Sequence, residues 1–123
     1  MPRRILVVDD NEMNLYLLTK ILELEGYQVI VGHDGAEAIQ LAEQNMPDMA
    51  LLDVMMPDIN GYDLCRKIRQ LPFGKEVPIV MLTAMSTEGE MAEALEAGAT
   101  DIWSKPFDMN MFRQRIGEMV KKD

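Results

Sequence analysis

Apolar and polar residues alternate along the chain in two recurring arrangements, which predict strands and helices in turn. Short continuous apolar runs are typical of strands buried on both faces of a parallel sheet. Five such runs occur, at Arg4–Val8, Gln28–Val31, Met49–Leu52, Ile79–Leu82 and Asp101–Trp103. The apolar residues between these runs recur at helical spacing. Five strand–helix repeats without internal linkers predict one α/β domain over residues 1–123.

Repeats of this kind place helices on both faces of a parallel sheet, because strand–helix–strand crossovers are right-handed. We expect a flavodoxin-like doubly wound fold, (βα)5, with a five-stranded sheet of order 2-1-3-4-5. The order follows from the fold type and not from the residues themselves.

Capping residues mark the helix ends. Asp34 with Glu37 and Thr87 with Glu90 have capping-box spacing, and Gly98 fits the end of the fourth helix. The predicted helices cover about residues 11–25, 34–46, a segment ending near 70, 87–98, and a segment that begins near Asp108. Their predicted inward residues are Leu15, Leu18 and Leu22, with Leu17, Ile21 and Leu24 beside them, then Ile39, Ala42 and Met46, then Leu64, Ile68 and Leu71, and finally Phe112, Ile116, Met119 and Val120.

Composition excludes several classes of protein. A formal net charge of −9 argues against direct nucleic-acid binding, which needs a basic patch. No apolar run approaches the roughly 20 residues that span a bilayer, and the N-terminus lacks the pattern of a signal peptide. The single cysteine, Cys65, cannot close an intrachain disulfide. We therefore expect a cytoplasmic protein that does not associate with membranes.

Polar residues stand where the apolar strands stop. Asp9 and Asp10 follow the first strand, Asp53 the third, Thr83 the fourth and Lys105 the fifth. Ligands of open α/β sheets bind beyond the carboxyl ends of the strands, near the point where the strand order reverses. The topology therefore brings three carboxylates together at one edge of the sheet, with a hydroxyl and an ammonium beside them.

Each residue also has a plain structural reading, since Asp10 could simply cap the next helix and Lys105 could be a solvated loop residue. Asp53 is harder to explain in this way, because an ionised carboxylate beside two others is unfavourable without a cation. Oxygen ligands without His or further Cys favour Mg²⁺ over zinc or copper. Asp53 can then act as the nucleophile in phosphoryl transfer, with Lys105 and Thr83 stabilising the transferred oxygens.

At these residues the chain closely resembles the response regulator receiver (CheY-like) family of two-component signalling. The resemblance covers residues 3–120 and rests on an ordered set of motifs: VVDD at 7–10, LLDVMMPDING at 51–61, MLTA at 81–84, EAGATD at 96–101 and KPF at 105–107.

The resemblance implies a role for each residue of the set. Asp53 is the phosphoacceptor, and Asp10, Asp53 and the backbone carbonyl of Met55 are Mg²⁺ ligands, with Asp9 acting through water. Mn²⁺ is an alternative ion. Thr83 and Lys105 take the roles argued above. The resemblance also implies a cis Lys105–Pro106 bond, which proline permits at low cost, and a Gly61 position that tolerates no side chain.

One position departs from the family pattern. Many members carry Tyr or Phe three residues before the lysine, and its rotation follows the threonine; this chain has Ile102 there. Trp103 points to the opposite face of the strand and cannot substitute. The resemblance therefore supports the Thr83 movement and leaves its aromatic part in doubt. Met55 and Met85 occupy loop positions that tune phosphoryl lifetime in the family and offer no group to orient water, which favours slow self-hydrolysis.

The resemblance implies a signalling domain that catalyses its own phosphorylation and dephosphorylation, not an enzyme with a separate substrate. Its expected partners are a sensor histidine kinase or phosphotransfer protein and a downstream effector or attached output domain. The fourth helix, fifth strand and last helix form the surface that family members use for effectors or homodimers. Acidic residues on the fourth helix and basic ones on the last could pair between protomers, or simply be solvated. The chain fits either a stand-alone regulator or one part of a longer protein.

Other functions remain less favoured. A phosphatase with an Asp nucleophile usually has a second Asp two residues later, where this chain has Met55. Flavin binding needs a phosphate cradle that the acidic first loop lacks. A phosphate-independent pseudo-receiver that acts as an interaction scaffold is the main alternative, and the five intact rim residues count against it.

Overall fold

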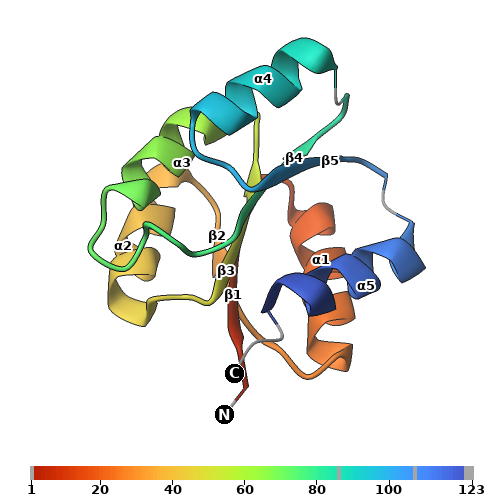
Figure 1. Ribbon diagram of the computed structural model, residues 1–123. Helices are drawn as coiled ribbons and strands as arrows, with labels where there is room; N and C mark the ends of the chain where they lie inside the picture. The colour runs from red at the N-terminus through yellow and green to blue at the C-terminus, as the bar shows by residue number, and fades with distance from the viewer. Residues whose placement is uncertain (1, 86, 107, 121–123) are drawn as a thin grey trace.

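The computed structural model describes residues 2–85, 87–106 and 108–120. Strands and helices alternate as predicted, in the order β1 (Arg4–Val8), α1 (Glu12–Leu24), β2 (Gln28–Gly32), α2 (Gly35–Asn45), β3 (Met49–Asp53), α3 (Gly61–Arg69), β4 (Ile79–Thr83), α4 (Glu88–Glu96), β5 (Asp101–Ser104) and α5 (Met109–Val120). The strands form one parallel sheet of order β2-β1-β3-β4-β5 (Figure 1). The predicted flavodoxin-like fold and strand order are confirmed.

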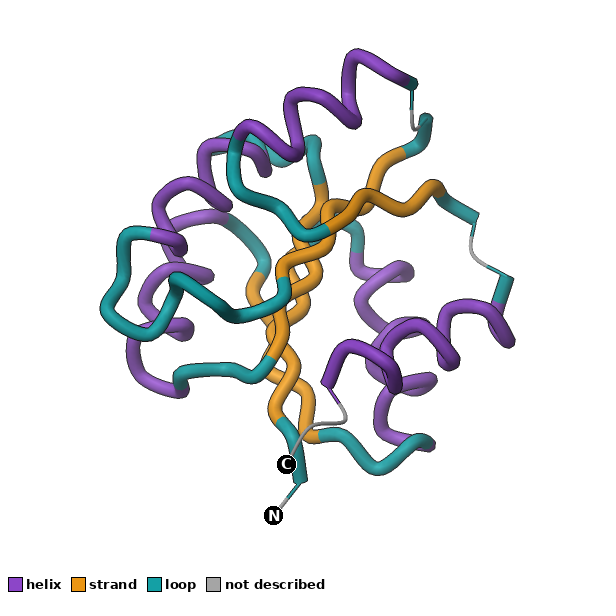
Figure 2. The backbone as a smooth tube through the Cα atoms, viewed as in Figure 1, coloured by secondary structure: helices purple, strands orange, loops and turns teal. Residues whose placement is uncertain are grey.

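The sheet lies between two helical layers, with α1 and α5 on one face and α2, α3 and α4 on the other (Figures 1 and 2). Every residue of β3 and β4 is buried. Alternate strand residues enter two separate apolar clusters, one under each layer. Burial on both faces explains why these strands are continuous apolar runs in the sequence.

The predicted inward residues of α1 and α2 are wrong at three positions, Leu17, Leu24 and Met46. In α1 the buried residues are Leu15, Leu18, Ile21 and Leu22, whereas Leu17 and Leu24 are exposed. A single stripe of α1 faces the sheet, so the second row of leucines reaches solvent at its edge. In α2, Met46 is exposed, because it is the C-cap residue with a left-handed φ of 47° and no longer follows the helical stripe.

Capping largely follows the prediction. The Asp34 side chain accepts from the Glu37 backbone N–H at 2.9 Å, and the Thr87 hydroxyl accepts from the Glu90 N–H at 3.2 Å. Gly98 has a φ of 98° just beyond α4, the left-handed conformation that favours glycine. The N-cap of α1 is Asn11, so the capping role considered for Asp10 belongs to its neighbour.

None of the helices in the described part of the chain has the length and apolar character that crossing a bilayer requires.

Candidate functional site

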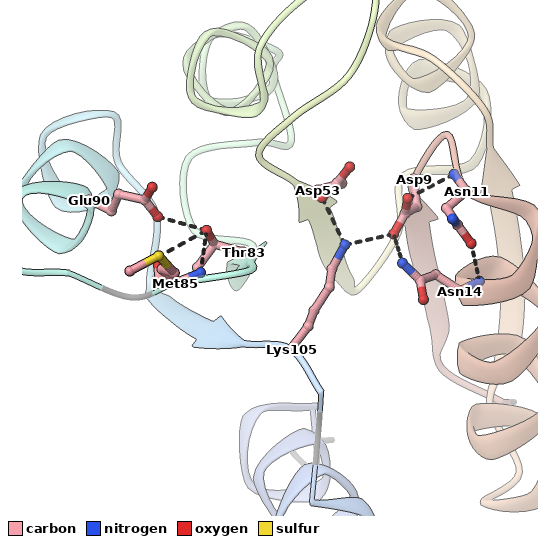
Figure 3. Close-up of polar contacts among 8 residues, drawn as sticks. All are labelled: Asp9, Asn11, Asn14, Asp53, Thr83, Met85, Glu90 and Lys105. Carbon is pink, nitrogen blue, oxygen red and sulfur yellow. Dashed lines mark hydrogen bonds and ion pairs between the residues drawn. The ribbon is translucent and has the colours of Figure 1, made fainter.

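The ends of β1, β3 and β5 bring a lysine and three aspartates together. Asp9, Asp10 and Asp53 each offer a carboxylate oxygen, and these oxygens lie within 4.8 Å of one another. Lys105 Nζ lies 3.0 Å from Asp53 Oδ1 and 3.3 Å from Asp9 Oδ2, so the ammonium bridges the two (Figure 3). The structure therefore confirms that these four residues lie close together at one edge of the sheet, as predicted.

Asp9 is fully buried and held by several donors. Its Oδ1 accepts from the Asn11 backbone N–H at 2.9 Å, and its Oδ2 accepts from Asn14 Nδ2 at 3.3 Å as well as from Lys105 (Figure 3). Neither Asn11 nor Asn14 was predicted to belong to the site. Two asparagines within one helical turn after an aspartate pair were the available signal. They fix the orientation of Asp9 and help to compensate its buried charge.

Electrostatics at the site oppose the ionised form of Asp53. Burial, with the negative charges of Asp9 and Asp10, raises the pKa of Asp53, although the Lys105 ammonium acts in the opposite direction. Burial alone would lower the pKa of Lys105, but its hydrogen bonds and charge interactions with Asp53 and Asp9 outweigh burial and raise that pKa. One lysine thus leaves an excess of negative charge among the carboxylates.

The donor set fits a hard divalent cation. The three clustered residues supply carboxylate oxygens only, the ligands that Mg²⁺ takes in proteins. Asp10 is exposed while Asp9 and Asp53 are buried, so the cluster opens to solvent on one side. A cation there would offset the charge excess that raises the pKa of Asp53. Zinc and copper prefer nitrogen and sulfur ligands, which this cluster lacks.

The loop after β3 carries Met55 and is anchored at both ends. The Val54 N–H donates to the Leu82 carbonyl at 3.0 Å, and the Gly61 N–H donates to the Val54 carbonyl at 2.8 Å. A side chain at Gly61 would collide with the Asp53 carbonyl oxygen and the Val54 Cα. This close approach gives the predicted intolerance at Gly61 its physical reason.

The middle of that loop is tied to α2. The Asp58 carboxylate accepts from the N–H groups of Gly35 and Ala36 at 3.0 and 3.2 Å. Its hydrogen bond to Gly35 is the main cause of a lowered pKa for Asp58. Asp58 therefore helps to hold the loop that presents Met55, a role that its sequence position alone did not indicate.

Thr83 lies apart from the other rim residues in its contacts. Its hydroxyl is buried and lies 2.7 Å from Glu90 Oε1 on α4 (Figure 3). The hydroxyl oxygen also accepts from the Met85 N–H at 3.3 Å. Glu90 was expected to complete a capping box with Thr87, and its carboxylate instead binds Thr83. The contact of Glu90 with Thr83 was not predicted from the sequence.

The residues around Lys105 follow the remaining expectations. The Lys105–Pro106 peptide bond is cis. Ile102 and Trp103 are both buried and belong to the clusters on opposite faces of the sheet, as strand alternation requires. Trp103 packs edge-on against Phe112, with ring centroids 5.7 Å apart. Phe107, the last residue of the KPF motif, lies outside the described residues.

A largely apolar groove of about 410 Å³ runs beside the site, between α1 and the start of α5. Lys105 forms part of its wall, together with Leu17 and Met109, which are both about half exposed. The exposed leucine that departed from the predicted inner stripe of α1 thus contributes to this groove.

Known proteins resemble the chain over nearly its whole length. The family model "Response regulator receiver domain" matches residues 5–117. Response regulator PleD of Caulobacter vibrioides is 40% identical over 98% of this chain. The chain spans 27% of the length of PleD and about half the length of other curated relatives that it matches. The receiver domain of sensor histidine kinase PA1611 from Pseudomonas aeruginosa, solved with magnesium coordinated in its active site cleft, has a TM-score of 0.90 and 32% identity over 99% of this chain and all of that chain. Chemotaxis protein CheY4 of Vibrio cholerae has a TM-score of 0.94 and 28% sequence identity. The match covers 98% of this chain and 100% of the CheY4 chain.

Proposed function

The chain belongs to the response regulator receiver domain family of two-component signalling, and on that premise we propose that it accepts a phosphoryl group on Asp53. The observation that carries the proposal is the ion pair between Lys105 and Asp53 inside a cluster of three carboxylates. A nucleophile, a fixed cation and a place for a second cation then occupy one sheet edge. We further propose that residues 1–123 act as a single receiver domain in the cytoplasm.

The proposed chemistry transfers a phosphoryl group from a phosphohistidine to a carboxylate. An Asp53 carboxylate oxygen attacks phosphorus, the new O–P bond forms, and the P–N bond breaks with its electron pair left on the imidazole nitrogen. Lys105, 3.0 Å from Asp53, neutralises charge on the transferred oxygens. After transfer, the Thr83 hydroxyl donates a hydrogen bond to one of these oxygens. The domain thus promotes its own phosphorylation and later dephosphorylation.

A bound Mg²⁺ would supply positive charge at the transferred oxygens. Asp10, Asp53 and the Met55 carbonyl are its proposed protein ligands, Asp9 acts through water, and Mn²⁺ is an alternative ion. The all-oxygen cluster and the raised pKa of Asp53 support this assignment. The similar receiver domain of PA1611 was solved with magnesium coordinated in its active site cleft, which is a further reason to expect this ion.

The proposed partners are the protein that donates the phosphoryl group and the protein or domain that responds to it. A sensor histidine kinase or phosphotransfer protein must bring its phosphohistidine next to Asp53, and the apolar groove beside Lys105 offers such a protein a contact surface. Phosphorylation then changes the surface of α4, β5 and α5, which acts on an effector, an attached output domain or a second copy of the chain. Nucleic acid and membranes are not proposed as direct ligands.

Acetyl phosphate provides the decisive test. Incubation with acetyl phosphate and Mg²⁺ should add one phosphoryl group, measured by intact mass, and the adduct should be absent in Asp53→Asn. Asp63→Asn, which removes an exposed carboxylate from α3, should still be modified. A wild-type chain that gains no adduct would refute the proposal and favour a phosphate-independent scaffold. An adduct that survives in Asp53→Asn would place the phosphoryl group on another residue and refute the assignment of Asp53. Sizing of the same samples reports whether phosphorylation changes the oligomeric state.

A further inference from the structure

The Thr83 hydroxyl has a strong partner, Glu90, on the side opposite to Asp53 (Figure 3). The hydroxyl carries one proton, and two acceptors compete for it: Glu90 Oε1 at 2.7 Å and the Met85 carbonyl at 3.1 Å. The shorter contact ends on a carboxylate, and hydrogen bonds to ionised groups are about twice as strong as neutral ones. Glu90 is therefore the favoured acceptor. This same proton is the one that a phosphoryl oxygen on Asp53 would need.

Glu90 is built into the first turn of α4 and is half-buried there. Its backbone N–H is held by the Thr87 hydroxyl at 3.2 Å. Its carbonyl accepts from the hydroxyl of Tyr62 on α3 at 3.5 Å, and Tyr62 is only 4% exposed. The carboxylate of Glu90 thus sits at a well-anchored point of the helix, so its contact with Thr83 joins the end of β4 to the start of α4.

We propose that Glu90 is a positioning residue that holds Thr83 turned away from Asp53 and releases it when Asp53 is phosphorylated. The inference rests on the proposed function, because the competing acceptor is the phosphoryl group. Once released, the Glu90 carboxylate remains at the N-terminus of α4, where the helix dipole favours negative charge. Thr83 then signals directly to α4, on a route that needs no aromatic side chain at Ile102.

The first test examines the unphosphorylated protein. Three-bond NMR couplings to the Thr83 methyl group report the rotamer of that side chain. Wild type should show one rotamer, and Glu90→Ala should show averaging among several. Glu93→Ala is the matched control, since it removes an exposed glutamate from the same helix and should leave the couplings unchanged. Wild-type couplings in Glu90→Ala would overturn the proposal.

The second test measures the competition itself, with beryllofluoride and Mg²⁺ as a phosphoryl mimic. Glu90→Ala should tighten beryllofluoride binding by about tenfold, because Thr83 no longer has to leave a charged acceptor. In a Thr83→Val background, which lacks the hydroxyl, the same change should have no effect beyond that of Glu93→Ala. An equal gain in both backgrounds would contradict the proposal.

The two tests separate this inference from the proposed function. A wild-type chain that binds no beryllofluoride would refute the phosphoacceptor assignment of Asp53. The rotamer of Thr83 would still decide whether Glu90 restrains it, because that measurement requires no phosphoryl group.

Discussion

Asp53 lies in surroundings that are unfavourable for its ionised carboxylate and that suit the function proposed for it. The residue is 6% exposed, its carboxylate lies near those of Asp9 and Asp10, and Lys105 is its positively charged partner among the described contacts. A buried ion pair gains little over its desolvation cost, and the additional like charges raise that cost. Further positive charge nearby would therefore stabilise the ionised carboxylate of Asp53, as its proposed role as phosphoacceptor requires.

The raised pKa of Asp53 predicts a specific pH dependence of stability in the absence of Mg²⁺. Between the ordinary aspartate value of 3.8 and the higher pKa in the folded chain, the native state holds a proton that the unfolded state has released. The free energy of unfolding contributed by this group is therefore largest below that window and falls as pH rises through it. Asp53→Asn lacks this contribution, so the variant should become progressively more stable relative to wild type as pH rises through the window. Denaturant unfolding across this pH range measures the difference, and a difference that does not vary with pH would contradict the prediction.

At the scale of elements, Arg69 links α3 to two loops at the end of the sheet away from the site: the loop between α3 and β4 and the turn between α4 and β5. Its guanidinium donates to the carbonyls of Gly98, Gly74 and Val77 at 2.8, 2.9 and 2.6 Å. The guanidinium fork suits several carbonyls at fixed positions in a way that a lysine ammonium does not. Arg69 therefore holds the turn at the C-terminal end of α4, while Glu90 contacts Thr83 at the N-terminal end of that helix.

Arg69→Ala should lower the free energy of unfolding by roughly 2–4 kcal/mol, because three carbonyls lose a charged donor and each such bond contributes on the order of 1 kcal/mol. Arg66→Ala is the matched control: it removes the surface pair with Asp63 and should cost about 0–1 kcal/mol. Urea unfolding followed by circular dichroism measures both. Equal effects of the two substitutions would show that the carbonyl contacts of Arg69 carry little stability.

At the scale of the whole molecule, charge is distributed unevenly and partly neutralised within the chain. The net charge of −9 coexists with basic residues on α5 that already have acidic neighbours. Arg115 lies 3.3 Å from Asp101 and stacks on Trp103, and Arg113 lies 3.7 Å from Glu25. Lys121 and Lys122 fall outside the described residues. Pairing of α4 and α5 charges between protomers would have to compete with these intrachain contacts.

Mg²⁺ should stabilise the whole domain by mass action. A ligand that binds only the folded state adds about 2.7 kcal/mol at one hundred times its dissociation constant. Thermal unfolding should shift upward with Mg²⁺ concentration in wild type and much less in Asp10→Asn, which removes one proposed ligand at an exposed position. KCl at matched ionic strength controls for screening of the net charge. The same shift in KCl, or in Asp10→Asn, would argue against a specific cation site.

Much of the fold could be predicted because the signals are local. A strand buried on both faces must be apolar nearly throughout, so β3 and β4 can be recognised in the sequence as continuous apolar runs. The polar residues that end these runs are Asp53 and Thr83. Caps such as Asp34 and Gly98 depend on neighbours within a few residues. Leu17, Leu24 and Met46 were assigned wrongly to the interior, because helical spacing does not reveal how wide a stripe the sheet will cover or where the last turn unwinds.

Residue patterns alone were enough to predict the succession of strands and helices and the family of the chain. They also predicted which end of the sheet carries the site residues Asp9, Asp10, Asp53, Thr83 and Lys105. The partner of each polar side chain, in contrast, became evident from the folded chain. Lys105 reaches Asp9 across 96 residues of sequence, and Glu90 binds Thr83 instead of closing a box with Thr87. The reason is physical: strand and cap signals lie in neighbouring residues, whereas a polar side chain chooses among acceptors that only the assembled fold brings within reach.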